Sequence, residues 1–234
     1  MNVVITGANK GLGLCLVKKF VQNGHKVLAG MYDKDDKSQL ESFASANQEN
    51  VLLVPMDVSD EGLVNKAAQI ARDALTTVDC LINVAGILLP SDREALIYNT
   101  DIGVLRKSLD INAVGTVIVM KAFLPIMRDD GNGMMIFITS EAGSISNSGS
   151  NFPSYSISKA AANKAVFILR ATVGDRYKIF AMHPGRMNTE MGRTTAQIEP
   201  EESADSIYDI AIGKKYVDAK KWGFINYKGE PMEI

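Results

Sequence analysis

Seven short apolar segments, which alternate with helical patterns, are the feature that most constrains the fold of this chain. Most of them are continuously apolar, which is typical of strands buried on both faces of a parallel sheet. The segments are N-V-V-I-T from Asn2, K-V-L-A-G from Lys26, V-L-L-V-P from Val51, V-D-C-L-I-N-V from Val78, M-M-I-F-I-T-S from Met134, Y-K-I-F-A-M-H from Tyr177 and W-G-F-I-N-Y from Trp222. The alternation predicts an α/β fold, because parallel strands need crossover connections, which are usually helices.

Helix signals lie between the apolar segments. Between the first two, apolar residues recur at helical spacing until the Asn23-Gly24 pair, which is typical of a helix C-terminus. After the third segment a second helical pattern begins, with Ser59 or Asp60 as the expected N-cap. We therefore predict a Rossmann-type, doubly wound, mainly parallel seven-stranded sheet with helices on both faces and right-handed crossovers. Residues 1–234 are expected to form a single domain, with substrate loops after strands four to six.

The composition is that of an ordinary globular chain. Of the 234 residues, 46% are hydrophobic and 22% are charged, and this length suffices for one large domain with a full core. The formal net charge is −2 without a basic stripe, so we expect no nucleic acid or membrane partner. The first strand begins at Asn2, which leaves no room for a signal peptide, and no apolar stretch approaches the ~18 residues of a membrane-spanning helix. These features predict a cytoplasmic protein.

Cysteine and histidine are both rare in the chain. Cys15 and Cys80 lie in apolar segments and form no C-x-x-C pair, so we expect reduced core thiols and neither a disulfide nor a redox site. The two histidines are far apart, and no other metal ligands cluster around them. The sequence therefore predicts no catalytic metal.

A glycine-rich segment, T-G-A-N-K-G-L-G from Thr6 to Gly13, follows the first strand and begins the first helix. In this context Gly7 permits a tight turn, Gly11 lets the backbone approach a pyrophosphate, and Gly13 lets the helix pack closely. The N–H groups at the helix N-terminus add positive potential for phosphates. The segment predicts a dinucleotide site. The alternative is a glycine-rich turn that binds no ligand.

Tyr155 and Lys159 are separated by one helical turn, so both side chains leave the same face of a helix. One interpretation is a surface pair worth a few tenths of a kcal/mol. The other is a tyrosine that donates a proton at neutral pH, which requires roughly 4 kcal/mol to lower its pKa from about 10 to about 7. A unit charge about 4 Å away supplies roughly that energy at an effective dielectric constant of ~20. Lys159 is the candidate for this charge.

Further short motifs follow along the chain. They are N-V-A-G from Asn83, D-I-N-A-V-G with Asn112, I-T-S-E-A-G with Ser140, and H-P-G-R-M-N-T-E-M-G from His183 to Gly192. Together with the glycine segment and Y-x-x-x-K, these motifs resemble the classical short-chain dehydrogenase/reductase family over nearly the whole chain. The last motif and the ending G-F-I-N-Y-K-G-E are most similar to the C-factor-like carbonyl reductases.

The resemblance implies an NAD(P)-dependent oxidoreductase that transfers hydride between the nicotinamide cofactor and a small carbonyl or alcohol substrate. It implies that Tyr155 is the general acid and base, that Ser140 binds the substrate oxygen, and that Lys159 also holds the nicotinamide ribose. Asn112 is expected to anchor a water that relays the proton. The residues expected at the cofactor are Gly7, Asn9, Lys10, Gly11, Leu12, Gly13, Asp57, Val58, Asn83, Ala85, Gly86, Tyr155, Lys159, Pro184, Gly185, Met187 and Thr189.

Two of these assignments have an alternative. Ser140 lies farther before Tyr155 than is usual in the family, and Ser144 is the rival for the serine role. We prefer Ser140 because Ser144 lies past the expected strand end. Asp57 occupies the place where the family usually contacts the adenine, but a simple acid before a helix fits it equally well. For His183 we expect a polar group at a strand end whose hydrogen bonds are satisfied.

We predict a preference for NADP(H), with NAD(H) as the alternative. An NAD-selective site usually has an acid at the end of the second strand, where it binds the ribose 2′-OH. That position falls on the neutral Met31, whereas Lys10 matches a basic position that NADP-dependent family members commonly use against the 2′-phosphate. Two observations argue against the preference: Tyr32 replaces the arginine often seen after the second strand, and Asp33 follows it.

The resemblance also bears on assembly and on competing functions. Segments 101–128 and 154–170 look like the long helices that pair across a dimer in this family, which implies a homodimer or homotetramer. The first competing function is a cofactor-binding sensor or signalling protein with incidental turnover, which would have no need of an acidic tyrosine. The second is an epimerase or dehydratase of the extended branch, which usually carries a larger substrate domain, and none is expected after Ile234.

Overall fold

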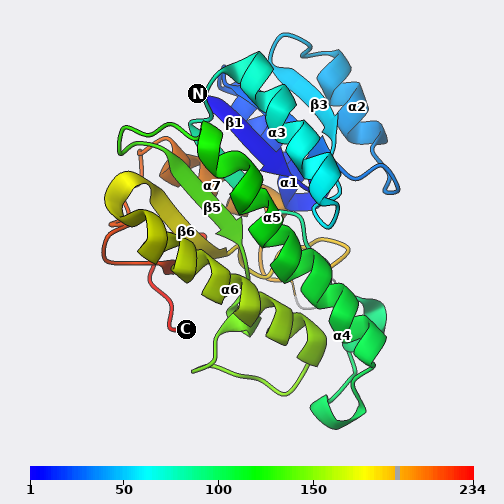
Figure 1. The fold of residues 1–234 in the computed structure, drawn as a ribbon. Coiled ribbons are helices and arrows are strands. Elements are labelled where there is room, and N and C mark those ends of the chain that lie inside the picture. The colour runs from blue at the N-terminus through cyan, green and yellow to red at the C-terminus, as the bar shows by residue number, and fades with distance from the viewer. Residues whose placement is uncertain (193–195) are drawn as a thin grey trace.

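A computed structural model of the protein describes residues 1–192 and 196–234, and its centre is a seven-stranded sheet (Figure 1). The strands are β1 (Asn2–Thr6), β2 (Lys26–Met31), β3 (Val51–Pro55), β4 (Cys80–Asn83), β5 (Met134–Ile138), β6 (Lys178–His183) and β7 (Phe224–Asn226). Their order is β3-β2-β1-β4-β5-β6-β7, and every neighbouring pair is parallel. The predicted doubly wound sheet is confirmed, and each of the seven apolar segments contains a strand.

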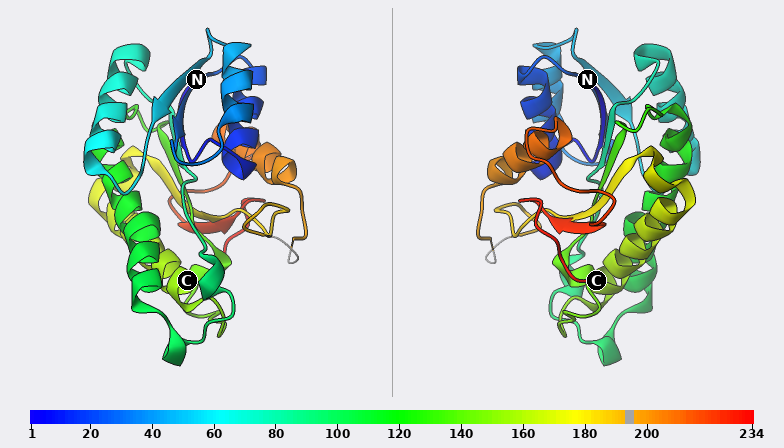
Figure 2. Two further views of the ribbon diagram at one scale, coloured as in Figure 1. Left: turned by 90° about the vertical axis from the view of Figure 1, so that its right-hand side faces the viewer. Right: turned by 90° about the vertical axis from the view of Figure 1, so that its left-hand side faces the viewer.

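Helices connect the strands and cover both faces of the sheet (Figure 2). The α-helices are α1 (Gly11–Gln22), α2 (Ser38–Ser45), α3 (Glu61–Leu75), α4 (Ile102–Leu109), α5 (Gly115–Phe123), α6 (Pro153–Val173) and α7 (Pro200–Ala211). Shorter helical turns are η1 (Pro90–Asp92), η2 (Ile97–Asn99), η3 (Asp110–Val114), η4 (Leu124–Ile126), η5 (Glu141–Gly143) and η6 (Gly174–Arg176). One layer contains α3, α5 and α6, and the opposite layer contains α1, α2 and α7.

The sheet separates two hydrophobic clusters, one under each helix layer. In β1, Val3 and Ile5 belong to the cluster under α1 and α7, whereas Val4 between them belongs to the cluster under α3, α5 and α6. Successive strand residues point to opposite faces, so a strand covered on both sides has to be apolar at every position. This arrangement explains why the strand segments are continuously apolar in the sequence.

Two helix termini form at the predicted signals. Helix α1 ends at its C-cap Asn23, and Gly24 follows with a φ of 77°, in the left-handed region that favours glycine. At the start of α3, the carboxylate of Asp60 accepts a hydrogen bond from the amide of Leu63 at 3.0 Å. Asp60 is therefore the N-cap of the two candidates.

The helical run Ile102–Ile126 corrects the expectation that no apolar stretch approaches the length of a membrane-spanning helix. This run of 25 residues reaches a mean hydropathy of 1.6, so by length and composition alone it is able to cross a membrane. The expectation was wrong because it counted unbroken apolar residues, whereas an average over a helix tolerates isolated polar residues such as Asn112 and Thr116. Within the described chain, parts of the run pack against α3 and α6, and 39% of its most apolar window is buried. Core helices of globular proteins meet the same criterion.

The same run contains a structural feature that the sequence did not predict. Between α4 and α5, the backbone of η3 widens into a π-helical turn over Asp110–Val114. Such turns are rare and occur frequently at functional sites. Asn112, one of the predicted catalytic residues, lies in the middle of this turn.

Candidate active site

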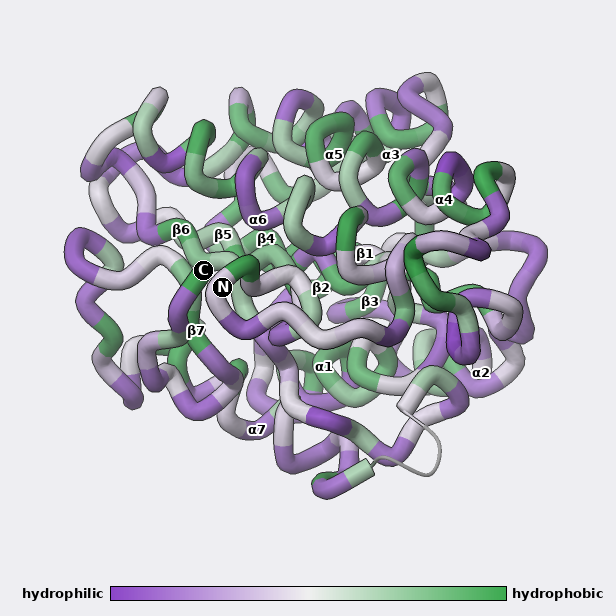
Figure 3. Tube along the Cα trace, turned by 90° about the horizontal axis from the view of Figure 1, so that it is seen from below, coloured by the Kyte–Doolittle hydropathy of each residue, from purple (hydrophilic) through white to green (hydrophobic). Residues whose placement is uncertain are grey.

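The predicted motifs meet at one edge of the sheet. Gly7, Gly86 and Ser140 lie just beyond the carboxyl ends of β1, β4 and β5, and Pro184 directly follows β6. In Figure 1 the strands run toward the lower edge of the molecule, and Figure 3 looks at that edge. The strand order reverses between β1 and β4, since β2 and β3 lie on one side of β1 and β4 to β7 on the other. Open α/β sheets bind ligands at such a switch point.

The glycine-rich turn after β1 has no room for side chains at two positions. Gly7 has a φ of 62°, and a Cβ there would lie 2.9 Å from the backbone of Ala85 in the loop after β4. A Cβ on Gly13 would lie only 2.1 Å from the carbonyl oxygen of Gly7. Both glycines are therefore required by the turn itself, whether or not a ligand binds.

The N-terminus of α1 offers donors to a ligand. Its N-cap is Lys10, which forms no capping hydrogen bond within the described part of the chain, and the first turn contains no acidic residue. Gly11 and the buried Leu12 begin the helix. Backbone N–H groups without partners and the positive end of the helix dipole suit a phosphate group.

A buried hydrogen-bond network joins β1, β4 and α5. The hydroxyl of Thr6 donates to Asn83 Oδ1 at 2.7 Å and accepts from the amides of Val84 and Ala85 at 3.0 and 3.1 Å. Asn83 Nδ2 in turn donates to the Thr116 hydroxyl at 3.2 Å. The amide side chain of Asn83 thus fixes the loop that faces the glycine turn. Val84 takes part in this network only through its backbone N–H, so its apolar side chain does not affect these hydrogen bonds.

Asn112 fixes the next part of the same loop. Its Oδ1 accepts from the backbone N–H of Ile87 at 2.8 Å, and its Nδ2 donates to the Ile87 oxygen and to Ser158 Oγ, both at 2.9 Å. Its backbone oxygen accepts from Thr116 at 2.8 Å. The side chain therefore links the loop after β4 to helix α6. The water relay assigned to Asn112 stays a prediction.

Lys159 is buried in the first turns of α6. Its side chain is 4% exposed, and Nζ donates to the carbonyl oxygen of Ile138 at the end of β5, at 2.9 Å. Burial lowers the pKa of Lys159 to about 8. A Cβ at Gly86 would lie 3.1 Å from this Nζ, so the glycine of N-V-A-G makes room for the ammonium group.

The pKa of Tyr155 in the protein alone departs from the sequence-based expectation. The Nζ of Lys159 lies 5.7 Å from the centre of the Tyr155 ring. Burial raises the pKa of Tyr155, a hydrogen bond to Ser140 lowers it, and the carboxylate of Glu141 raises it, with a net increase. The expected lowering was wrong for the protein alone, because it counted the lysine charge and omitted the cost of burying a phenolate.

Of the two candidate serines, Ser140 is the one that lowers the pKa of Tyr155. It lies just beyond β5, is 8% exposed, and its Oγ accepts from the amide of Ala142 at 3.1 Å. The Oγ of Ser144 is instead 3.2 Å from Ser146 Oγ and accepts from the amide of Asn147, also at 3.2 Å. Ser144 thus stabilises its own loop, and the preference for Ser140 agrees with the geometry.

The loop after β6 reaches back to the glycine-rich turn. The backbone oxygen of Pro184 accepts from Ser203 in α7 at 2.7 Å, and Gly185 follows with a φ of 86°. Met187 then pairs with Ile198 in an isolated parallel bridge. Thr189 faces the start of α1, where a Cβ on Gly11 would lie 3.5 Å from its methyl group.

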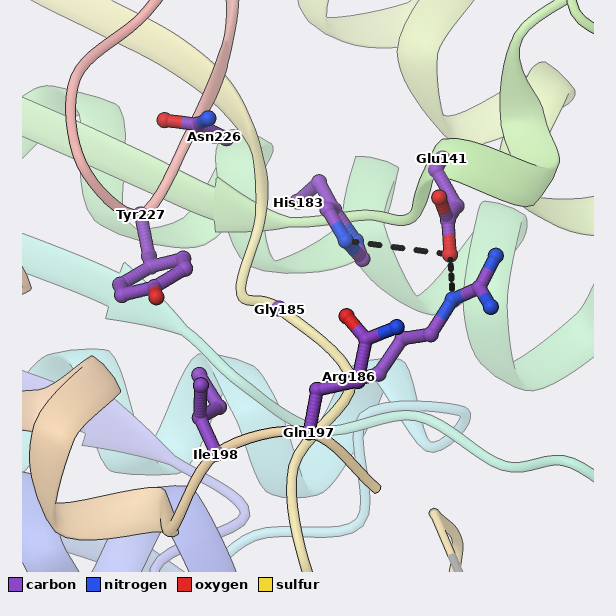
Figure 4. A pocket seen from close by; sticks show the side chains of 8 residues that line it. All are labelled: Glu141, His183, Gly185, Arg186, Gln197, Ile198, Asn226 and Tyr227. Carbon is purple, nitrogen blue, oxygen red and sulfur yellow. Dashed lines mark hydrogen bonds and ion pairs between the residues drawn. The ribbon is translucent and has the colours of Figure 1, made fainter. Parts of the chain in front are cut away.

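A polar cavity of about 370 Å³ lies between this loop, η5 and β7 (Figure 4). Glu141 Oε1 pairs with Arg186 Nε at 2.6 Å and lies 3.9 Å from His183 Nε2. Burial opposes ionisation of Glu141, but the hydrogen bond from Arg186 and the neighbouring positive charges outweigh it and lower its pKa.

His183 corrects another expectation. Its buried Nδ1 has no partner among the described residues, so it is not a satisfied polar group. Burial lowers the pKa of His183, which favours its neutral form. The described residues contain no group of three or more His, Cys, Asp and Glu side chains placed to hold a metal ion.

Comparison with known proteins identifies the family. The model of the short chain dehydrogenase family matches residues 1–200. The chain belongs to the short-chain dehydrogenases. An uncharacterized oxidoreductase of Schizosaccharomyces pombe is 30% identical over 80% of this chain and 74% of its own. The NADP-dependent 3-hydroxy acid dehydrogenase YdfG of Salmonella typhi is 26% identical over 93% of this chain and 92% of its own. The carbonyl reductase Sniffer of D. melanogaster has the same fold, with a TM-score of 0.86, 24% identity, and coverage of 100% and 99%.

In this short-chain dehydrogenase the predicted cofactor-selecting lysine is already paired. Lys10 Nζ lies 2.9 Å from Glu190 Oε2 and 3.4 Å from Asp35 Oδ2, and its side chain is 54% exposed. The hydrogen bond to Glu190 is the main reason that the pKa of Lys10 is raised. Sequence reasoning missed both acids, because Glu190 lies far along the chain and Asp35 lies in a loop whose shape no motif predicts.

Asn9 and Asp57 shape the loops at this end of the dehydrogenase. The buried Asn9 binds both backbone groups of Tyr32, accepting from its N–H at 2.7 Å and donating to its oxygen at 2.9 Å. Asp57 Oδ1 accepts from the N–H and the hydroxyl of Ser59, at 3.0 and 2.7 Å, as expected of an acid before a helix. The buried Val58 packs against Gly115, where a Cβ would lie 2.9 Å from its methyl group. Contacts of these residues with a cofactor stay a prediction.

Proposed function

We propose that this short-chain dehydrogenase is an NADP(H)-preferring oxidoreductase that interconverts a small carbonyl compound and the corresponding alcohol. The position of Tyr155 carries the proposal. Its phenol lies close enough to Ser140 for that side chain to lower its pKa, and its ring centre lies 5.7 Å from the Nζ of the buried Lys159, at the switch point of the sheet. A group that exchanges a proton with a substrate oxygen needs such neighbours, because one orients the oxygen and the other favours the phenolate.

The carboxyl edge of the sheet, where the predicted motifs meet, is called the rim below. The residues at the rim fit a nicotinamide dinucleotide. The uncapped N-terminus of α1 offers N–H groups to the phosphates, and Gly11 leaves the approach free of a side chain. Lys159 would hold the nicotinamide ribose, since its ammonium group has three protons and, among the described residues, donates one hydrogen bond, to the Ile138 oxygen. The bound cofactor supplies or accepts the hydride.

The proton steps belong to the protein's own side chains. Tyr155 donates its phenolic proton to the substrate oxygen in reduction and takes it back in oxidation. Ser140 accepts from Ala142 through Oγ, so its own hydroxyl hydrogen is free to bond to the phenol or to the substrate oxygen. The positive charge of Lys159 stabilises the phenolate that forms when the proton leaves, and opposes the effect of burial.

The preference for NADP(H) is supported by Lys10 and Met31. Met31 ends β2 with a neutral side chain, so the position from which an acid usually binds the ribose 2′-OH holds no carboxylate. Lys10 would exchange its pairs with Glu190 and Asp35 for the phosphate, and exposed ion pairs of this kind are typically worth only about 0–1 kcal/mol. The similarity to an NADP-dependent 3-hydroxy acid dehydrogenase supports the same choice.

The proposal includes a homodimer or homotetramer in the cytoplasm. Large apolar residues are exposed on the run around α5 and on α6, where the long helices of two subunits would pair. They are Val114, Val117, Ile157 and Ile168, at 49%, 42%, 39% and 57% exposure. The molar mass in solution, measured by light scattering, tests the assembly, and a monomer at all concentrations would contradict it. Localisation of a tagged chain in its host cell tests the compartment.

The catalytic proposal is tested with a panel of small carbonyl compounds and alcohols, followed by the absorbance of the reduced cofactor. On any substrate found, Tyr155→Phe is expected to lower kcat about 10²–10⁴-fold, because it removes the general acid. The Kd for NADPH should remain nearly unchanged in this variant, since the phenol is not needed for binding. A variant that keeps more than about a tenth of wild-type kcat would contradict the role of Tyr155.

A further inference from the structure

A buried carboxylate lies beside helix α6, and none of the roles described above uses it. Asp92 ends the turn η1 and is 1% exposed. Among the described residues, Asp92 and Lys159 are the two buried residues with charged side chains. Burying a carboxylate is costly unless hydrogen bonds replace the lost water. Asp92 therefore has to be held by donors.

The donors are two backbone amides at the start of α6. Asp92 Oδ1 accepts from the N–H of Ser154 at 3.1 Å, and Oδ2 accepts from the N–H of Tyr155 at 2.8 Å. Amides at the second and third helix positions usually bond to the side chain of the N-cap residue. Here the N-cap is Phe152, whose side chain forms no such bond and whose φ is 56°, and Pro153 has no amide hydrogen. Asp92 replaces the missing local cap from a distant part of the chain.

The chain segment that leads to Asp92 also contacts the other residues of the site. A Cβ at Gly86 would lie 3.1 Å from the Nζ of Lys159, and Ile87 exchanges two hydrogen bonds with Asn112. Asp92 follows five residues after Ile87 and binds the start of the helix that carries the tyrosine. A negative charge there also interacts favourably with the helix dipole. The loop after β4 thus connects the lysine, the asparagine and the tyrosine.

We propose that Asp92 is a positioning residue for Tyr155, because it fixes the first turn of α6 and with it the distance from the phenol to Ser140. This inference rests on the proposed role of Tyr155 as general acid and base. Reacting groups have to meet in a narrow range of geometry, and a misplacement of ~1 Å costs about a hundredfold in rate. Loss of the Asp92 carboxylate is therefore expected to impair turnover more than cofactor binding.

The experiment compares Asp92→Ala, which removes both acceptors, with Asp92→Asn, which keeps one acceptor at nearly the same volume. We expect kcat per NADPH-binding site to fall about a hundredfold and about tenfold, respectively, while Kd for NADPH stays within about twofold. The matched control is Asp101→Asn. Asp101 caps α4 through the amides of Gly103 and Val104, at 2.7 and 3.0 Å, on a helix without a predicted catalytic residue. Its kcat per binding site should stay within about twofold of wild type.

A merely structural role gives a different result. In that case the Asp92 variants would lose thermal stability as Asp101→Asn does, with kcat per binding site unchanged, and this outcome would overturn the inference. Amide hydrogen exchange at Tyr155 adds a readout without turnover: it should accelerate in Asp92→Asn, and an unchanged rate would also overturn the inference. If Asp92→Ala does not fold, Asp92→Asn decides. Activity retained by Tyr155→Phe refutes the proposed function itself, whereas an inactive Tyr155→Phe beside an unimpaired Asp92→Asn refutes only the role of Asp92.

Discussion

The two halves of the rim are built in opposite ways. Around α6, Lys159 is 4% exposed, and its ammonium group bonds to the backbone oxygen of Ile138 and forms no ion pair with an acid among the described residues. At the other end, beyond β2, Lys10 is 54% exposed, and two exposed carboxylates, Glu190 and Asp35, pair with it. The same residue type is thus buried at one end of the site and more than half exposed at the other.

This difference in burial determines how much each lysine contributes to the energetics of its site. Burial moves the pKa of Lys159 from 10.5 to about 8, so keeping this side chain protonated costs the folded protein free energy. The pairs of Lys10 are exposed, and such pairs contribute about 0–1 kcal/mol and weaken with salt. We therefore expect large, specific effects from changes near α6 and small, additive effects beyond β2.

The largest effect should come from Lys159→Met, which removes the buried charge with little change in volume. The folded-state pKa of about 8 lies below the unfolded value of 10.5, so the unfolded state binds more protons between these pH values. The wild-type free energy of unfolding should therefore rise by about 3 kcal/mol relative to the variant from pH 8 to pH 10.5. Urea unfolding of both proteins across this range measures the difference.

The control for this prediction is Lys164→Met, an exposed position on the same helix. The stability difference between wild type and this variant should not change with pH over the same window. A pH-independent difference for Lys159→Met as well would mean that the lysine titrates normally, and the contrast between buried and exposed lysines would then be lost.

The contrast also explains what the sequence could and could not predict. Strand segments, the glycine turn and the one-turn spacing of Tyr155 and Lys159 are local patterns, and local geometry dictates them. The pKa of Tyr155 was predicted in the wrong direction, because burial and the carboxylate of Glu141 are set by tertiary packing. Asp92 was missed for the same reason, since its bonds span 62 and 63 residues and match no motif.

A smaller effect is expected beyond β2, where Lys10→Ala should weaken NADPH binding. Loss of a charge-assisted hydrogen bond worth ~1.5–3 kcal/mol raises Kd for NADPH roughly ten- to a hundredfold, with little effect on NADH. Glu190→Gln should act in the opposite sense, because it removes a competitor for the lysine. Calorimetric Kd values for both cofactors measure this selectivity.

Lys37→Ala is the matched control for the cofactor experiment. Lys37 is also paired with two acids, Asp33 and Glu41, in the same part of the chain, but it matches no cofactor position. Its Kd for NADPH should stay within about twofold of wild type. Tighter binding of NADH than NADPH by the wild type, or equal losses for both cofactors in Lys10→Ala, would contradict the proposed preference.

The smallest effect should arise in the polar cavity, where Glu141 raises the pKa of Tyr155 from the neighbouring residue of Ser140. Carbonyl reduction needs the protonated phenol, so its rate falls as pH rises through this pKa. Glu141→Gln removes the negative charge and leaves Arg186 unpaired, and the alkaline limb of the pH–rate profile should therefore move to lower pH. Arg186→Gln leaves Glu141 unpaired, and the limb should move to higher pH. Because both variants break the same ion pair, a purely structural effect would move the two profiles in the same direction. Opposite shifts would identify electrostatics as the cause. The charges in the polar cavity would then adjust the pKa of Tyr155, whose position depends on the buried residues around α6.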